Sequence, residues 1–261
     1  MRSWVVIALA AAVAAAGCGS GVLKKQYEYE EELYLSLDGS ATLSVHASVP
    51  ALVALRGVDL NVSPRARFDR DRLRAFYEGP GATVTAVSSS RRYGRRFVHV
   101  SIDVADVRSL QRLAPFAWSS YRFDRDGDVY KFKQAVGAPA AGRAVEDVGW
   151  DGSELIAFRL HLPSKIPYHN APSRKIERGN ILEWEQTLTD RLHGAPIDTT
   201  TGDGIIQVHM ETQSILARTL LLFGSTIVAA ILMFAAIIWW VSRRGRDSEI
   251  NQLPAAGSRQ P

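Results

Sequence analysis

The sequence predicts an α+β fold: a mixed or antiparallel β-sheet with two or three short helices, followed by a single transmembrane helix. Apolar and polar residues alternate through many segments, as expected where successive side chains of a strand face opposite ways. A run of 23 uncharged residues, 219–241, is long enough to cross the ~30 Å hydrocarbon core of a bilayer. Short amphipathic segments between the strands favour helices packed on one face of the sheet, and an all-β sandwich is the second choice.

Three hairpins account for most of the predicted sheet. The first joins alternating segments 33–37 and 41–49 through Asp38-Gly39, a favoured tight turn. The second pairs 82–88 with 96–104 across the polar connection 89–95. The third pairs 121–123 with 129–135 around Asp126-Gly127. Further strands are expected at 155–162, 181–187 and 205–211. The helices are expected at 72–77 and 106–113, packing through Leu73, Phe76, Val107, Leu110 and Leu113.

The N-terminus has the form of a lipoprotein signal peptide, residues 1–17. Arg2 precedes an apolar run that ends in small residues and is too short to span a bilayer comfortably. The run closes on Ala15-Ala16-Gly17-Cys18, which resembles the bacterial lipobox, although Ala15 stands where Leu is usual. We therefore expect Cys18 to be diacylated, with residues 18–25 as a tether. Ordinary cleavage near Ala16 is the alternative.

The C-terminal end of the sequence predicts how the chain is oriented in the membrane. Trp239 and Trp240 are aromatics typical of the bilayer interface, and three arginines follow at 243, 244 and 246. The positive-inside rule then places residues 242–261 in the cytoplasm as a disordered tail. We expect residues 26–214 to form an extracytoplasmic domain of a protein held in the inner (plasma) membrane by a lipid and by one spanning helix.

Charge and cysteine content exclude several classes of protein. The net charge of +4 resides in the terminal segments, so residues 19–214 are neutral overall and no nucleic-acid-binding surface is predicted. The single cysteine excludes an intramolecular disulfide framework. The six histidines lack metal-ligand spacing, and we expect neither a metal nor another cofactor.

Motifs for catalysis are weak. Neither a G-x-S-x-G serine nor a thiolate beside a histidine is present. The carboxylates of segment 124–128 fit a hairpin turn better than a calcium loop. Five further carboxylates either converge as acid and base or form a charged outer strand face, which is the commoner meaning: Glu30, Glu31, Glu32, Glu183 and Glu185.

One dense basic cluster surrounds Tyr93 at a predicted hairpin tip. Its arginines are Arg91, Arg92, Arg95 and Arg96. Four cations around an aromatic ring are able to contact phosphate headgroups or an acidic partner. Plain solubility is the simpler interpretation and is the favoured one.

The order of these parts resembles the LppM-type envelope proteins of actinobacteria and other bacteria. The local pattern is Phe158-Arg-Leu160-His-Leu162-Pro163, then Asn170, then Gly179-Asn-Ile-Leu-Glu-Trp184. The resemblance covers residues 26–241, and segment 172–178 is an extra loop relative to the family pattern. It implies a mixed α/β extracytoplasmic domain with an apolar cavity suited to lipid, and no catalytic residues.

We therefore expect a non-enzymatic, membrane-anchored binding domain whose partners are membrane lipids or an envelope protein. The walls of an apolar groove are expected from strand residues whose plainer role is core: Leu43, Val45, Val100, Ile102, Leu160, Leu162 and Trp184. A scaffold of an inner-membrane complex is one alternative. An envelope hydrolase, with His161 or His169 beside a carboxylate, is another. The sequence leaves the ligand, the biological process and the oligomeric state open.

Overall fold

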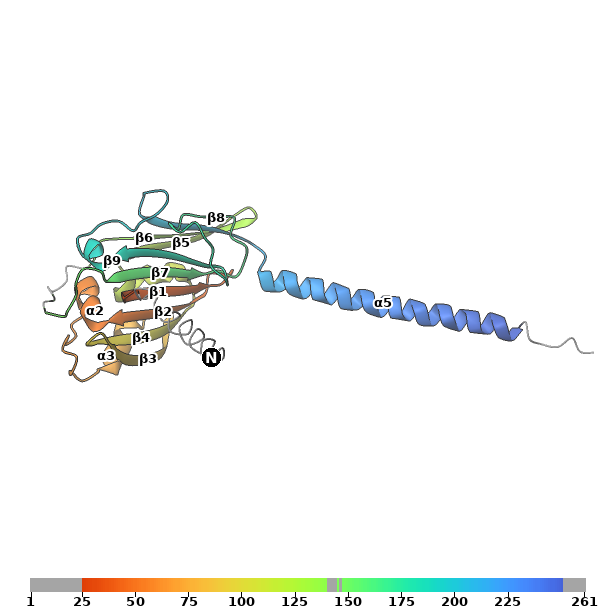
Figure 1. The fold of residues 1–261 in the computed structure, drawn as a ribbon, viewed down its shortest axis with the longest axis horizontal. Helices are drawn as coiled ribbons and strands as arrows, with labels where there is room; N and C mark the ends of the chain where they lie inside the picture. Colours follow the sequence, from red (N-terminus) through yellow and green to blue (C-terminus); the bar gives the residue numbers. More distant parts are fainter. Residues whose placement is uncertain (1–24, 140–144, 146, 251–261) are drawn as a thin grey trace, which may run out of the picture.

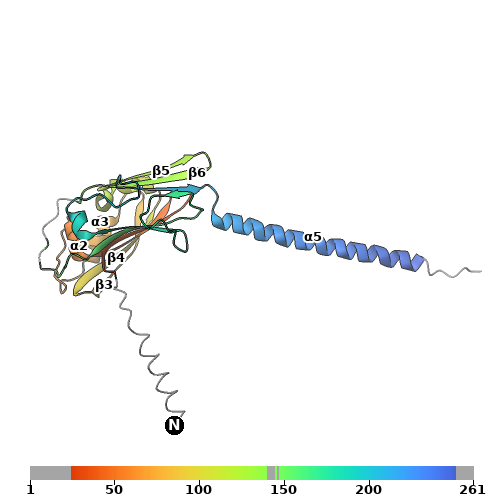
Figure 2. The same cartoon turned by 45° about the horizontal axis from the view of Figure 1, so that its top comes forward.

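The computed structural model describes residues 25–139, 145 and 147–250, and shows a rounded body from which one long helix extends (Figures 1 and 2). The predicted signal peptide, Cys18 and the end of the tail lie outside the described residues. The long helix is α5, Ile215–Ile250, of which Ile215–Arg243 is long and apolar enough to cross a membrane. The predicted membrane segment 219–241 falls inside it.

The larger sheet has six strands in the order β3-β4-β2-β1-β7-β9. All neighbours are antiparallel except β1 and β7, which run parallel. The two faces of this sheet differ in burial, as β1 shows. Tyr29, Glu31 and Leu33 are buried, while the even-numbered residues from Glu30 to Tyr34 are partly or fully exposed on the other face. The strands are β1 (Tyr27–Leu35), β2 (Ala41–Ser48), β3 (Ala82–Arg92), β4 (Arg95–Val104), β7 (Leu155–His161) and β9 (Ile181–Thr187).

The smaller sheet has four antiparallel strands in the order β5-β6-β10-β8. Its last long strand, β10, leads directly into α5. The strands are β5 (Ser119–Asp126), β6 (Val129–Val136), β8 (Tyr168–His169) and β10 (Ile205–Glu211). The prediction of an α+β fold with a mixed sheet is confirmed, although the strands divide between two sheets.

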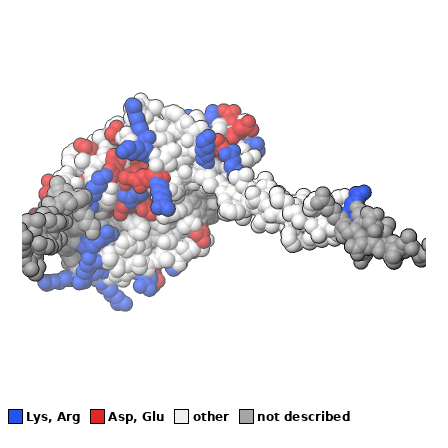
Figure 3. Space-filling view, turned by 45° about the vertical axis from the view of Figure 1, so that its right-hand side comes forward, with Lys and Arg blue, Asp and Glu red and all other residues white. Residues whose placement is uncertain are grey.

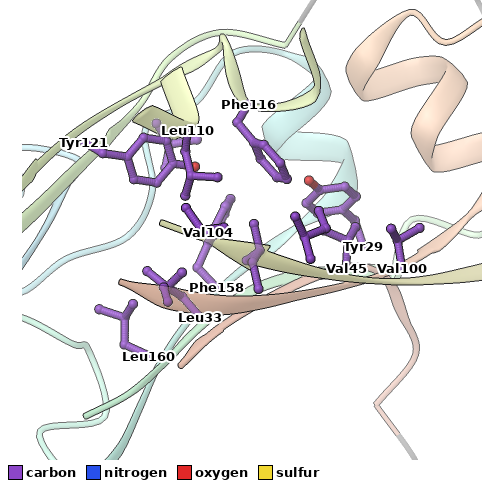
Figure 4. Packing of buried hydrophobic residues seen from close by; sticks show 14 of the residues in the cluster. Tyr29, Leu33, Val45, Val100, Val104, Leu110, Phe116, Tyr121, Phe158 and Leu160 are labelled. Carbon is purple, nitrogen blue, oxygen red and sulfur yellow. The ribbon is translucent and has the colours of Figure 1, made fainter. Parts of the chain in front are cut away.

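A continuous apolar core joins the two sheets and the short helices. In Figure 4, Leu110, Phe116 and Tyr121 from one layer face Leu33 and Phe158 from the larger sheet. The helical elements are α2 (Val49–Arg56), α3 (Arg70–Tyr77), η1 (Val107–Arg112), η2 (Ala114–Phe116) and α4 (Leu188–Leu192), of which η1 and η2 are 3₁₀ helices. Four of the five predicted helix contacts are buried, and Phe76 packs partly buried against the same core.

Several local details differ from the sequence predictions. The strand predicted at 33–37 is β1, which begins at Tyr27 and ends at Leu35. Residues 242–250, predicted as part of a disordered tail, continue the helix α5. The connection expected at 89–95 is only Tyr93-Gly94, since β3 and β4 continue to Arg92 and from Arg95. Both turn residues have positive φ, 52° and 72°, which fits the twist of a two-residue hairpin. The helix α2 was not predicted, because all eight of its residues are buried and no polar face marks its period.

Candidate functional site

An open groove of about 720 Å³ lies at the edge of the body where β1, β4 and β7 end and β2 begins. Its volume is within the range of small-molecule binding sites. The lining mixes apolar, hydroxyl and ionisable side chains: Tyr34, Leu35, Ser36, Ser40, Ala41, Thr42, Asp103, Val104, His161, Leu162, Pro163 and Gly179.

The groove adjoins the start of α5. The backbone N–H of Ile215, the first residue of the helix, donates to the carbonyl of Pro163 at 3.0 Å. The next residue along, Ser164, donates its hydroxyl to the carbonyl of Glu211 at 2.7 Å. Glu211 in turn pairs with Arg218 of α5 at 2.6 Å. A wall of the groove and the base of the helix are thus joined by direct bonds.

Polar chemistry in the groove centres on His161. Its ring stacks on Tyr34 with 3.9 Å between centroids, and its Nε2 lies 4.0 Å from a carboxylate oxygen of Glu32. Burial lowers the pKa of His161, and Glu32 opposes that shift. On the other side, the Thr42 hydroxyl donates to Asp103 at 3.2 Å. The groove therefore offers hydroxyl, carboxylate and imidazole groups for hydrogen bonding.

The seven residues predicted to wall an apolar groove are all buried, between 0% and 5% exposed. Leu162 lines the open groove described above. Leu43 and Leu160 border an internal cavity of about 10 Å³, which holds one water at most. Val45, Val100, Ile102 and Trp184 pack as core residues. A role for this set in lipid binding stays a prediction.

The four arginines of the β3–β4 hairpin have different environments. Arg91 and Arg92 are exposed, and Arg92 lies over the ring of Phe97 at 4.5 Å. Arg96 is half-buried and donates to the carbonyl of Pro64 at 3.0 Å. Arg95 is 4% exposed and pairs with the fully buried Glu28 at 2.9 Å. Arg95 is thus occupied inside the domain, and the other three are those that reach solvent.

Four of the five carboxylates singled out in the sequence converge on the outer face of the larger sheet. Arg159 pairs there with Glu30, Glu32 and Glu183, and Lys25 pairs with Glu185. Figure 3 shows carboxylates gathered on the body with basic side chains among them. These side chains are partly exposed and matched with cations, as on a charged outer strand face.

The fifth carboxylate, Glu31, faces the interior. It accepts from Arg56 at 3.2 Å and from the hydroxyl of Tyr29. Burial raises the pKa of Glu31, against the opposing charge of Arg56. The sequence contained no signal for this buried pair, because Arg56 lies in the unpredicted helix α2.

The histidines do not assemble a metal centre among the residues that the structure describes. His46 and His99 meet on neighbouring strands, with 2.6 Å between their Nδ1 atoms. His169 accepts from the backbone N–H of Ala171 and lies on β8 of the smaller sheet. Of the two histidines considered for acid–base chemistry, His161 is the one placed beside a carboxylate.

Comparisons with known proteins add little. No protein-family model matches this sequence, and no curated protein matches it. Among solved structures, the chain is similar to the NMR structure of the folded domain of Mycobacterium tuberculosis LppM. The identity is 13% and the TM-score 0.39, over 76% of this chain and 98% of that domain. This is a distant likeness of fold, and no function follows from it.

Sequence reasoning missed most of the groove. Tyr34, Ser36, Thr42 and Asp103 were assigned to strands and turns without a role. The available signal was partial: Leu162, Pro163 and Gly179 belong to the motif noted at residues 158–184. Their partners come from distant hairpins, so the pairing of β1 with β7 was needed to bring them together.

Proposed function

We propose that this protein is a membrane-anchored binding domain that holds the headgroup of an envelope lipid in the groove beside α5. The observation that carries the proposal is the hydrogen bond from Ile215 to Pro163, which fixes the groove at the base of the apolar helix. Binding without catalysis is part of the proposal. A protein partner at the same surface is the competing outcome of the test below.

The length of the helix supports this placement. Its apolar span has 29 residues, Ile215–Arg243, which at 1.5 Å per residue extends for about 43 Å. That length matches a bilayer including its headgroup layers, about 40–45 Å. If the helix spans the membrane, Ile215 lies at headgroup level, and so does the groove bonded to it. Lipid headgroups would then meet the groove without leaving their leaflet.

The proposed topology follows from charge. The arginines at 243, 244 and 246 favour a cytoplasmic C-terminus, which puts the groove on the extracytoplasmic side of the inner membrane. A diacyl group on Cys18 would add a second attachment to the same membrane. Two attachments would hold the body close to the bilayer, as a headgroup-binding groove requires.

Native mass spectrometry of the full chain, released from nanodiscs of its host lipids, tests the proposal. Thr42→Trp fills the groove from an exposed position, and Ser88→Trp is the matched control, exposed on β3 opposite His99 of β4. We expect one retained lipid per chain in the wild type and in Ser88→Trp, and at least a tenfold loss in Thr42→Trp. A lipid-free wild type with a stoichiometric protein partner would instead support the scaffold alternative.

The contact between His161 and Glu32 favours a second candidate function, a hydrolytic site. An imidazole beside a carboxylate is a general-base arrangement. In that case His161→Ala would abolish release of acyl or headgroup products from host lipids, while a binding site would lose only part of its affinity. Incubating the full chain with its host lipids and analysing the products by mass spectrometry separates the two.

A further inference from the structure

A second polar site lies inside the domain, around the ring of Trp118. The guanidinium groups of Arg56, from α2, and Arg191, from α4, both lie over this ring. Tyr29 of β1 meets it edge-on, with 6.1 Å between ring centroids. Arg56 and Arg191 are 8% and 1% exposed, although arginine is seldom buried without a partner.

The bonds that these arginines make leave part of each guanidinium unused. Nη2 of Arg56 donates to the Tyr29 hydroxyl at 2.8 Å and to Glu31 at 3.2 Å. Arg191 donates to the carbonyl of Ala195 at 2.9 Å through Nη1, and to that of Gly137 through Nη2. Each of these bonds uses a terminal nitrogen.

Four buried nitrogens of the cluster have no hydrogen-bond partner: Nε and Nη1 of Arg56, Nε of Arg191, and Nε1 of Trp118. These groups only donate, so another arginine or tryptophan cannot satisfy them. The hydroxyl of Tyr77 is buried and unpartnered as well. Buried donors of this kind are rare and call for an acceptor.

The charge of the cluster points to an anion. Both arginines are buried, and the one buried carboxylate paired with them, Glu31, contacts Arg56 at 3.2 Å, which leaves an excess of positive charge. Burial lowers the pKa of Arg191, and the like charge of Arg56 adds to the effect. An uncompensated buried cation is costly, and an added negative group would offset that cost.

We propose that the cluster of Arg56, Trp118 and Arg191 binds a phosphate group. Its unused donors come from α2, from α4 and from the connection between η2 and β5. A tetrahedral oxoanion presents oxygens in several directions, whereas a carboxylate presents two in one plane. None of the three residues lines the groove beside α5, so this site is separate from the one proposed above. The phosphate belongs either to a free ion or to a phospholipid headgroup.

Nuclear magnetic resonance of the full chain in detergent, in phosphate-free buffer, tests this site. The indole N–H signal of Trp118 is assigned by its absence in Trp118→Phe. One arm adds inorganic phosphate to protein stripped of lipid, and the other transfers the protein to nanodiscs of phosphatidylglycerol. We expect the Trp118 signal to move in at least one arm, and which arm moves it identifies the source. A ³¹P measurement on the purified chain detects phosphorus already bound.

Variants complete the test. We expect Arg191→Met to weaken the response at least tenfold, and Arg122→Met, an exposed arginine on β5, to leave it unchanged. Trp118→Phe removes one donor and keeps the ring, so its affinity for the active probe, measured by calorimetry, should also fall even if Arg191→Met does not fold. An unmoved Trp118 signal with no bound phosphorus, or wild-type affinity in both variants, would overturn the proposal.

Discussion

Two buried carboxylates on β1 show how side-chain direction decides the role of a charge. Glu28 and Glu31 lie on opposite faces of the strand, and each meets an arginine from another element. Glu28 accepts from Arg95 and from the indole of Trp150, while Glu31 joins the cluster around Trp118. The side chains of both pairs are buried. In contrast, Glu30 and Glu32 of the same strand form a partly exposed network with Arg159 of β7.

Arg95→Met should lower the free energy of unfolding by about 3–5 kcal/mol, because it leaves Glu28 charged, buried and unpaired. Chemical unfolding followed by tryptophan fluorescence measures the change. Arg92→Met is the control on the same hairpin, where loss of an exposed ring contact costs about 1 kcal/mol or less. Equal effects of the two variants would contradict the buried role of Arg95.

The His46–His99 pair predicts a pH dependence. Burial lowers the pKa of His99 from its ordinary 6.5, and the charges of His46 and Arg92 add to the shift. The unfolded chain therefore takes up this proton first as the pH falls, so the pair destabilises the fold below about pH 6.5. The stability of the wild type should fall more steeply between pH 7 and pH 5.5 than that of His99→Gln. Parallel pH profiles of the two proteins would refute this.

Elements with a clear period could be predicted from the sequence, and elements without one could not. Alternation located β2, β4 and the last three residues of β1, because one face of their sheet is buried and the other is solvated. It gave no sign of α2, whose residues are buried all round. Pairing between distant strands, such as β1 with β7, depends on tertiary contacts, and the groove depends on that pairing.

Ser48 is the last residue of β2 and the N-cap of α2, the helix that ends with Arg56. Its hydroxyl accepts from the backbone N–H of Ala51 at 3.1 Å. Ser48→Ala should cost about 1 kcal/mol of stability, as for other N-caps. Ser44→Ala, at a half-buried position in the same strand, is the control and should cost less than half as much. Thermal unfolding of the three proteins is the measurement, and an unchanged midpoint in Ser48→Ala would exclude the capping role.

At the scale of the whole molecule, α5 determines where the groove lies relative to the proposed membrane. The helix leaves the body as a straight rod (Figure 1), and its apolar side chains between Arg218 and Arg243 are exposed. A bilayer is the surrounding that removes this apolar surface from water. The bond between Pro163 and Ile215 then sets the height of the groove above the membrane.

Reporter fusions check the proposed orientation. Green fluorescent protein attached after residue 261 should fluoresce, because it folds in the cytoplasm, and alkaline phosphatase at the same point should be inactive. The arginines at 243, 244 and 246 favour this cytoplasmic location of the C-terminus. Replacing all three with glutamine should weaken this preference. An active phosphatase fusion of the wild type would contradict this orientation, because it would place the tail outside the cytoplasm and the groove inside it.

Photo-crosslinking in intact membranes tests the central claim most directly. Benzoylphenylalanine placed at position 36 lies in the groove, and at position 88 it lies on the same sheet outside the groove lining. We expect lipid adducts at position 36, identified by their mass, and at least tenfold fewer at position 88. Equal capture at the two positions, or only protein adducts at position 36, would contradict a lipid-binding groove at the base of α5.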